Sequence, residues 1–273
     1  MLYRAGFSPV SAIVVIALAM ASTSCSSSSG DGDSGTASTG DMPSVHLEQT
    51  IVMLSSGRPQ EETAYRQMLA DCQKAGSPTT PIAAGDVAKI GRKKLVETIE
   101  AQRASRRVDQ WKVDAATPCQ FRLVHTGEQE IQTADGKSYR VDLATNEGDV
   151  QDLGAPQPRE AVNEGDLDQA AQATGWKRGG QSQVQGQGCE SWTAPTGDQY
   201  CVWTGGSKWG FSRAGINALD GDGITSDSAI VLQATPPPAG FGWSVQTDNF
   251  TVGKAADAST FAVPANARIA ASN

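Results

Sequence analysis

Residues 130–143, EIQTADGKSYRVDL, give the clearest indication of the fold. The dipeptide Asp135-Gly136 is typical of a two-residue β-hairpin turn, because both residues tolerate a positive φ. Beyond the turn, apolar side chains from Tyr139 to Leu143 alternate with charged ones. This period of two is expected of a strand with one buried face. The stretch therefore predicts an antiparallel hairpin.

Other β-rich runs lie on both sides of this hairpin, and the 29 glycines and 13 prolines of the chain favour many turns between them. Runs of β-branched and aromatic residues bounded by Gly, Pro, Asn or Asp predict strands. We expect strands at 45–54, 108–113, 119–125 and 137–143, and in the second half at 181–192, 199–204, 208–212, 229–234, 243–247 and 250–252.

Three segments are expected to be helical. Residues 61–75 combine an apolar stripe at helical spacing with two acids in the first turn, and Gly76 suits the position after the last turn. Residues 86–103 predict a second, weaker helix, and residues 160–173 a short polar one. The predicted fold class is α+β, with N-terminal helices packed on a curved antiparallel sheet and a β-rich C-terminal half.

The second predicted helix and the residues after it are strongly basic. This group, in which only Glu97 and Glu100 oppose the positive charge, consists of Lys89, Arg92, Lys93, Lys94, Arg103, Arg106 and Arg107. It is either a solvated helix face or a surface that contacts anionic lipid headgroups or an acidic partner.

The N-terminal segment has the features of a secretory signal. Arg4 supplies a positive charge, and residues 10–20 (VSAIVVIALAM) form an apolar run that is too short to cross a bilayer as a helix. Ordinary signal peptidase would cut after Ala21. The alternative is cleavage directly before Cys25.

The motif at 22–25, STSC, resembles a bacterial lipobox, in which the cysteine becomes the first mature residue and carries lipid. Ser22 departs from the family pattern, where Leu, Val or Ile is usual. Residues 26–41 contain only Ser, Gly, Asp, Thr and Ala, so they are expected to be a flexible tether. The resemblance to bacterial lipoproteins implies lipidation at Cys25, and Ser26 after it implies sorting to the outer membrane.

We therefore expect a protein of the bacterial cell envelope, anchored in the outer membrane and facing the periplasm, with secretion as the alternative. The predicted organisation is a signal peptide at 1–24 and a disordered Ser/Gly tether at 25–44. An α+β region follows at 45–153, then a linker with a short helix at 154–175 and a β-rich region at 176–273.

Four cysteines remain once Cys25 is set aside, an even number that suits an oxidising compartment. Cys189 and Cys201 flank a turn signal, and a hairpin folded about Pro195 would place them directly opposite each other. A pair between Cys72 and Cys119 follows by elimination. The alternative is that the four cysteines are buried free thiols.

Composition excludes several functions. The net charge of −8, from 22 basic and 30 acidic residues, excludes a generally basic nucleic-acid binder. The two histidines, His46 and His125, do not accompany a Gly-x-Ser-x-Gly motif, so a hydrolytic triad is not expected. Residues 220–227 resemble part of a calcium loop, but a Gly/Asp turn explains them. We predict no catalytic residues, no metal and no cofactor.

Aromatic side chains concentrate in the second half, where they form either the core or a face that stacks on sugar rings. They are Trp176, Trp192, Tyr200, Trp203, Trp209, Phe211, Phe241 and Trp243. The cysteine hairpin, Cys201-Val202-Trp203, the Gly-flanked Trp209 and residues 261–264 (FAVP) resemble late strands of LolA/LolB-like half-barrel domains. That resemblance, over about 189–273, implies an apolar concavity that holds an acyl chain.

The expected protein is a non-catalytic cell-envelope lipoprotein that binds lipid or another apolar ligand or supports envelope assembly. Its expected partners are the membrane, through the lipid anchor, and a lipid or an envelope protein. Two alternatives remain open. One is a glycan-binding module of the periplasm or cell surface, and the other is a hydrolase without a recognisable motif.

Overall fold

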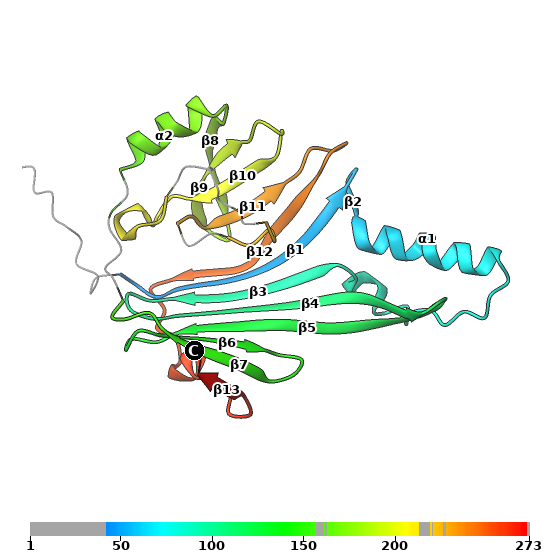
Figure 1. The fold of residues 1–273 in the computed structure, drawn as a ribbon. Coiled ribbons are helices and arrows are strands. Elements are labelled where there is room, and N and C mark those ends of the chain that lie inside the picture. The colour runs from blue at the N-terminus through cyan, green and yellow to red at the C-terminus, as the bar shows by residue number, and fades with distance from the viewer. Residues whose placement is uncertain are drawn as a thin grey trace, which may run out of the picture. The chain divides into compact units, whose positions relative to one another are not determined.

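The computed structural model describes residues 42–156, 161, 163–212, 219, 221–225 and 228–271. These residues build a thirteen-stranded sheet in the order β13-β7-β6-β5-β4-β3-β1-β12-β11-β10-β9-β8, with β2 paired to β1 beside this path (Figure 1). Paired strands are antiparallel except β13 and β7. The strands are β1 (Val45–Ser55), β2 (Arg58–Pro59), β3 (Arg92–Ile99), β4 (Ala104–Thr117), β5 (Gln120–Gln132), β6 (Lys137–Asp142), β7 (Glu147–Asp152), β8 (Lys177–Val184), β9 (Gln187–Thr193), β10 (Gln199–Trp203), β11 (Val231–Thr235), β12 (Phe241–Val252) and β13 (Arg268–Ala271).

The predicted α+β class with N-terminal helices packed on the sheet is wrong. The fold is β-rich, and the described residues contain two α-helices, α1 (Gln60–Lys74) and α2 (Glu164–Ala173). Three short 3₁₀ helices complete this part of the chain: η2 (Val87–Lys89), η3 (Ser207–Trp209) and η4 (Ala258–Phe261). The helices predicted at 61–75 and 160–173 correspond to α1 and α2.

Residues 86–103 do not form the predicted second helix. They make η2 and then β3, which pairs with β1 on one side and β4 on the other. Leu95 and Ile99 are four residues apart, a spacing that fits one face of a helix and one face of a strand equally well. Two long neighbouring strands supply cross-strand contacts on both sides, and these contacts decide in favour of a strand.

Several predicted strands differ in their limits. The run at 181–192 is two strands, β8 and β9, because Gln185 and Gly186 both have positive φ and make a tight turn. The runs at 243–247 and 250–252 are one strand, β12. The strand predicted at 208–212 is absent, since η3 occupies its first residues.

The main core begins at β1, in which alternate residues from Val45 to Ile51 are fully buried. They pack with side chains of β3 and of strands β9 to β12. Gln49 is the polar member of this row. Its amide nitrogen donates hydrogen bonds to the Val231 carbonyl (2.6 Å) and the Thr247 hydroxyl (3.1 Å), which lowers the cost of burying it.

A second, smaller core lies beneath α1. Tyr65 is buried on the helix and packs edge-on against Phe121, with ring centroids 5.4 Å apart. The Tyr65 hydroxyl also accepts a hydrogen bond from the backbone N–H of Ile82 (2.9 Å). These contacts hold α1 and the segment that follows it against the start of β5.

The structure joins the cysteines as Cys72–Cys119 and Cys189–Cys201, with Cα–Cα distances of 5.8 and 5.3 Å. A hairpin folded about Pro195 would place Cys189 and Cys201 directly opposite each other, but in the structure they are not directly opposite. Cys189 lies opposite Trp203 and Cys201 opposite Ser191. The turn is centred one residue later than expected, which shifts each partner by two positions, and the disulfide crosses the hairpin diagonally.

Removing either disulfide should destabilise the protein, and the longer loop should matter more. By the chain-entropy model, replacing Cys189 and Cys201 by alanine costs about 3 kcal/mol, and replacing Cys72 and Cys119 costs about 4 kcal/mol. Urea unfolding of the two double variants measures these losses. A non-reducing peptide map that shows Cys72 or Cys119 linked to a cysteine of the other pair would contradict both assignments.

Candidate functional site

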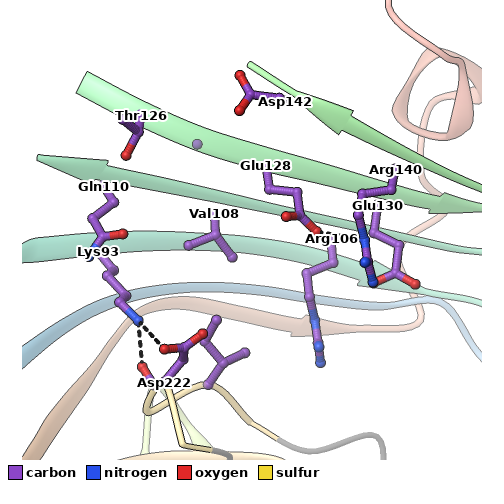
Figure 2. A pocket seen from close by; sticks show the side chains of 12 residues that line it. Lys93, Arg106, Val108, Gln110, Thr126, Glu128, Glu130, Arg140, Asp142 and Asp222 are labelled. Carbon is purple, nitrogen blue, oxygen red and sulfur yellow. Dashed lines mark hydrogen bonds and ion pairs between the residues drawn. The ribbon is translucent and has the colours of Figure 1, made fainter. Parts of the chain in front are cut away.

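A groove with a cavity volume of about 450 Å³ lies on one face of strands β3 to β6 (Figure 2). The strand register places its lining side chains in rows across the sheet. Arg106, Glu130 and Arg140 are consecutive cross-strand neighbours in one row.

Because successive side chains of a strand point to opposite faces, the next row on this face lies two residues away. That second row contains Val108, Glu128 and Asp142, and a third contains Gln110 and Thr126.

A loop at 221–225 forms the wall opposite these strands, and Lys93 attaches it to the sheet. The Lys93 ammonium donates a hydrogen bond to the Asp222 carbonyl (2.8 Å), lies 3.4 Å from its carboxylate and sits 4.7 Å from the centre of the Trp243 ring. Lys93 is only 5% exposed. The cation–π contact and the two oxygens therefore compensate a charge that has left water.

Arg106 makes a second attachment. Its guanidinium pairs with Glu97 (2.9 Å) and donates to the Thr225 carbonyl (2.9 Å). Arg140, the third cation of the groove, pairs with Glu128 (3.0 Å). Each cation of the lining is thus already matched to an acid.

Two carboxylates of the groove are not matched in this way. In the described part of the chain, Glu130 and Asp142 form no ion pair within 4 Å. Backbone N–H groups of Thr145 and Ala144 hydrogen-bond to Asp142 and hold the pKa of its carboxyl below the ordinary value, so it is ionised at neutral pH.

Gln110 and Thr126 contribute uncharged polar groups to the same groove. Their side chains make no hydrogen bond to another described residue. The groove thus offers anionic oxygens, a free amide and a free hydroxyl above the apolar floor of Val108. This arrangement suits a polar ligand that brings a positive charge.

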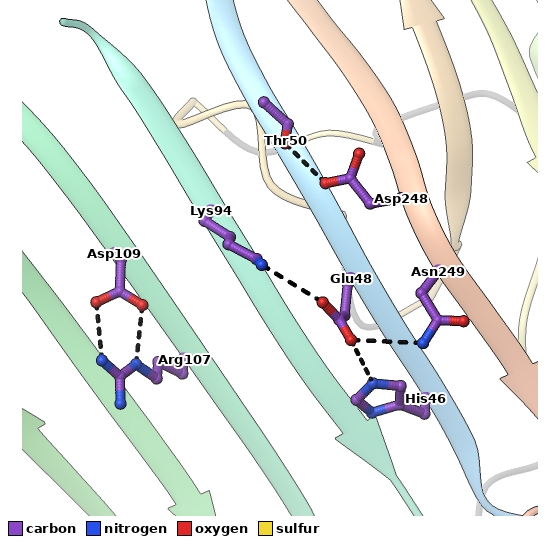
Figure 3. A network of polar contacts seen from close by, with 8 residues as sticks. All are labelled: His46, Glu48, Thr50, Lys94, Arg107, Asp109, Asp248 and Asn249. Carbon is purple, nitrogen blue, oxygen red and sulfur yellow. Dashed lines mark hydrogen bonds and ion pairs between the residues drawn. The ribbon is translucent and has the colours of Figure 1, made fainter. Parts of the chain in front are cut away.

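The opposite face of the sheet carries a polar network around Glu48, on strands β1, β3 and β12 (Figure 3). His46 lies 3.4 Å from the Glu48 carboxylate, and Lys94 and Asn249 lie 3.5 and 3.4 Å from it. The hydrogen bond from His46 is the main reason that the pKa of Glu48 falls below its usual value, against the opposing effect of burial. The other nitrogen of His46 is 3.0 Å from the Thr98 hydroxyl.

His125 belongs to a second polar group on this face. It lies 2.8 Å from Asp109, and Arg107 donates two hydrogen bonds to the same carboxylate (2.8 and 3.0 Å). Burial raises the pKa of Asp109, but the hydrogen bonds from Arg107 and His125 outweigh it and lower the pKa. His125 also packs beside Trp111, with ring centroids 5.2 Å apart. Both histidines are therefore on the face away from the groove.

The structure corrects the predicted basic helix face. Its members lie on β3, on β4 and in the connections before each of them, and individual acids compensate them. Lys89 pairs with Asp86, and Arg103 pairs with Glu100. The Arg92 guanidinium donates to a backbone carbonyl. The continuous cationic surface that would contact anionic headgroups is not formed.

The aromatic side chains of the second half mainly build the core. Trp192, Trp203 and Phe211 are at most 2% exposed, and Trp203 packs against Phe211 and Phe250 at centroid distances of 5.7 and 5.2 Å. Phe241 is the exception, at 59% exposure. The buried members cannot stack on a sugar.

Sequence reasoning placed Lys93 and Arg106 in a basic helix face and residues 220–227 in a calcium-like turn, and it did not identify a groove. The signal available was the alternation of neutral and acidic residues along 127–130, but it shows which residues share a face only once the register is known. Cys25 and the proposed signal lie outside the described residues, as do Asp220 and Asp227 of the calcium-like stretch. No helix in the described part of the chain is long and apolar enough to cross a membrane.

Comparisons with known proteins do not assign this chain to a family. No protein-family model and no curated protein matches it. Among solved structures, that of PNGF-II is similar at a TM-score of 0.35 and 8% identity, over 84% of this chain and 32% of that chain. The chain thus spans about a third of the length of that structure. The proposals below use the geometry of the chain itself.

Proposed function

We propose that this protein is a non-catalytic binding module of the bacterial cell envelope, tethered through a lipid on Cys25, which takes a polar, amine-bearing ligand in the groove on β3 to β6. A short peptide with a free amino group has the required chemistry. Its ammonium would meet Glu130 and Asp142, and its amide groups would meet Gln110 and Thr126. The peptide could come from the envelope in which the module is anchored.

The observation that carries this proposal is that the positive and negative side chains of the groove differ in whether they have an ion-pair partner. All three cations are matched to acids, whereas the carboxylates of Glu130 and Asp142 have no ion-pair partner in the described chain. Glu130 is half-buried, and an ionised group that is partly withdrawn from water favours an opposite charge that can share its hydrogen bonds. Asp142 is exposed and adds a second negative charge on the neighbouring strand. A cationic ligand satisfies this requirement, and an anionic one does not.

The same lining argues against an acyl chain in this groove. Burying ionised side chains beneath hydrocarbon costs free energy that no hydrogen bond would return. A hydrolytic role has no support from the histidines either, because His46 and His125 are on the other face of the sheet. We therefore propose binding without catalysis.

Isothermal titration with the tripeptide Lys-Gly-Gly and its fully acetylated form tests the proposal. The free amines should bind and the acetylated peptide should not. Glu130→Gln should weaken binding at least about tenfold, because a hydrogen bond to a charged group contributes about 1.5–3 kcal/mol. Binding should also weaken as salt is added.

Asp248→Asn is the matched control, since it removes one exposed carboxylate from the other face of the sheet. It should leave the affinity unchanged. Equal binding of the free and acetylated peptides, or equal losses in the two variants, would contradict the groove as the site. Binding of an uncharged oligosaccharide in place of the peptide would favour the glycan-binding alternative.

A further inference from the structure

The end of the sheet where the described chain begins also carries an exposed apolar side chain. Leu153 is 61% exposed, and beside it lies a cavity of about 350 Å³ whose lining includes Ile99, Ala101 and Ala155. This volume is at the lower limit of those that hold small ligands. The groove of the proposed function shares no lining residue with this cavity, so this is a separate site.

Contacts with the β5–β6 turn fix the position of the backbone at Leu153. Its N–H donates to the Gly136 carbonyl (2.8 Å), and Gly136 in turn packs directly against the backbone of Gly154. A Cβ at Gly136 would lie 1.9 Å from the Gly154 carbonyl oxygen, so only glycine permits this contact. The segment that carries Leu153 is therefore fixed to the β5–β6 turn and keeps its apolar side chain directed outward.

The position of Met42 shows that the preceding chain reaches this same end. A neighbouring cavity is lined by Met42 together with residues 100–103, which also line the cavity beside Leu153. Sixteen residues, 26–41, separate Cys25 from Met42. An anchor on Cys25 would thus hold this end of the sheet closest to the bilayer.

The charges around the cavity cancel in pairs. Arg103 binds Glu100 at 2.6 Å and also lies 4.0 Å from the centre of the Phe261 ring, and Lys137 lies 3.4 Å from Asp135. A surface without excess positive charge gains little from anionic lipid. Its contact with a bilayer would depend on apolar burial and would not require a negatively charged headgroup.

We propose that this end of the domain rests on the bilayer, with Leu153 inserted among the lipids. The occupant is a neutral phospholipid surface. In the cell the contact rests on the proposed tether at Cys25, which brings the two together. The bilayer-facing end then consists of the β3–β4 connection, the β5–β6 turn and the segment around Leu153.

Hydrogen exchange on the mature chain tests this orientation. The chain from Cys25 is coupled through that thiol to a maleimide lipid in phosphatidylcholine vesicles, so the measurement does not depend on lipidation in the cell. Backbone amides at 99–104, 132–137 and 152–155 should exchange about fivefold more slowly on vesicles than in solution. Leu153→Asp should abolish this protection without changing exchange in solution elsewhere.

Phe241→Asp provides the matched control. Phe241 is 59% exposed but pairs with Ser55, at the opposite end of β1 from Met42. This variant should keep the vesicle-dependent protection. Protection that is equal at both ends of β1, or that survives Leu153→Asp, would overturn the proposal. The peptide titration is unaffected by either result, so failure of the groove and failure of the bilayer contact are separable.

Discussion

Replacing Cys25 by alanine should transfer the protein almost completely from the membrane fraction to the soluble fraction. The lipobox-like motif provides one thiol for lipidation, and two or more acyl chains are needed for stable anchoring. Without them, an apolar contact the size of Leu153 gives only weak, reversible attachment. Fractionation of cells, followed by intact-mass analysis of the mature chain, measures the change.

Ser26→Ala is the control for this experiment, because it alters the neighbouring residue and keeps the cysteine. It should leave the protein on membranes, although by resemblance to lipoproteins it bears on sorting. The competing cleavage after Ala21 makes a distinct prediction. A mature chain that begins at Ser22 and carries no lipid would contradict the anchor and favour secretion.

Replacing Trp203 by alanine should cost about 3–5 kcal/mol of folding free energy, the range for removing a large aromatic side chain from a core. Trp203 is 2% exposed and contacts the rings of Trp209, Phe211 and Phe250. Gly206 also packs directly against its ring. These contacts are lost together, and β10 and β12 are no longer joined by that side chain. Urea denaturation measures the change.

Phe241→Ala is the comparison for Trp203, since Phe241 is largely exposed and its removal should cost less than about 1 kcal/mol. Similar losses in the two variants would contradict the assignment of Trp203 to the core. A glycan-binding face built on these aromatic residues predicts the reverse pattern. In that case Trp203→Ala would abolish sugar binding with little effect on stability.

Local sequence signals were reliable where neighbouring residues decide the structure. The Asp135-Gly136 turn, the β1 strand and the helix at α1 follow from turn chemistry, strand alternation and helix-end preferences over short stretches. The segment at 86–103 failed for a physical reason. Its apolar spacing satisfies both periods, and the choice depended on β1 and β4, of which β1 lies about 45 residues earlier in the chain.

The candidate site could not be derived from the sequence for a related reason. Arg106, Glu130 and Arg140 lie in one row only because two hairpins have a particular register. A shift of one residue would send these side chains to the other face of the sheet. The loop that closes the groove comes from 221–225, more than 100 residues after Lys93, and its attachment to Lys93 has no signature in the sequence.

By itself, the sequence determined the properties that depend on composition and short-range order: the acidic net charge, α1 and the β-hairpin at 130–143. The signal segment and the tether stay predictions. Only the tertiary structure decided that residues 92–99 form a strand, that the aromatic side chains of β9 and β10 form a core, and that mixed charges line a groove. These outcomes depend on which strands pair and in what register. That choice is made by burial and cross-strand contacts between residues far apart in the chain, so no local pattern can record it.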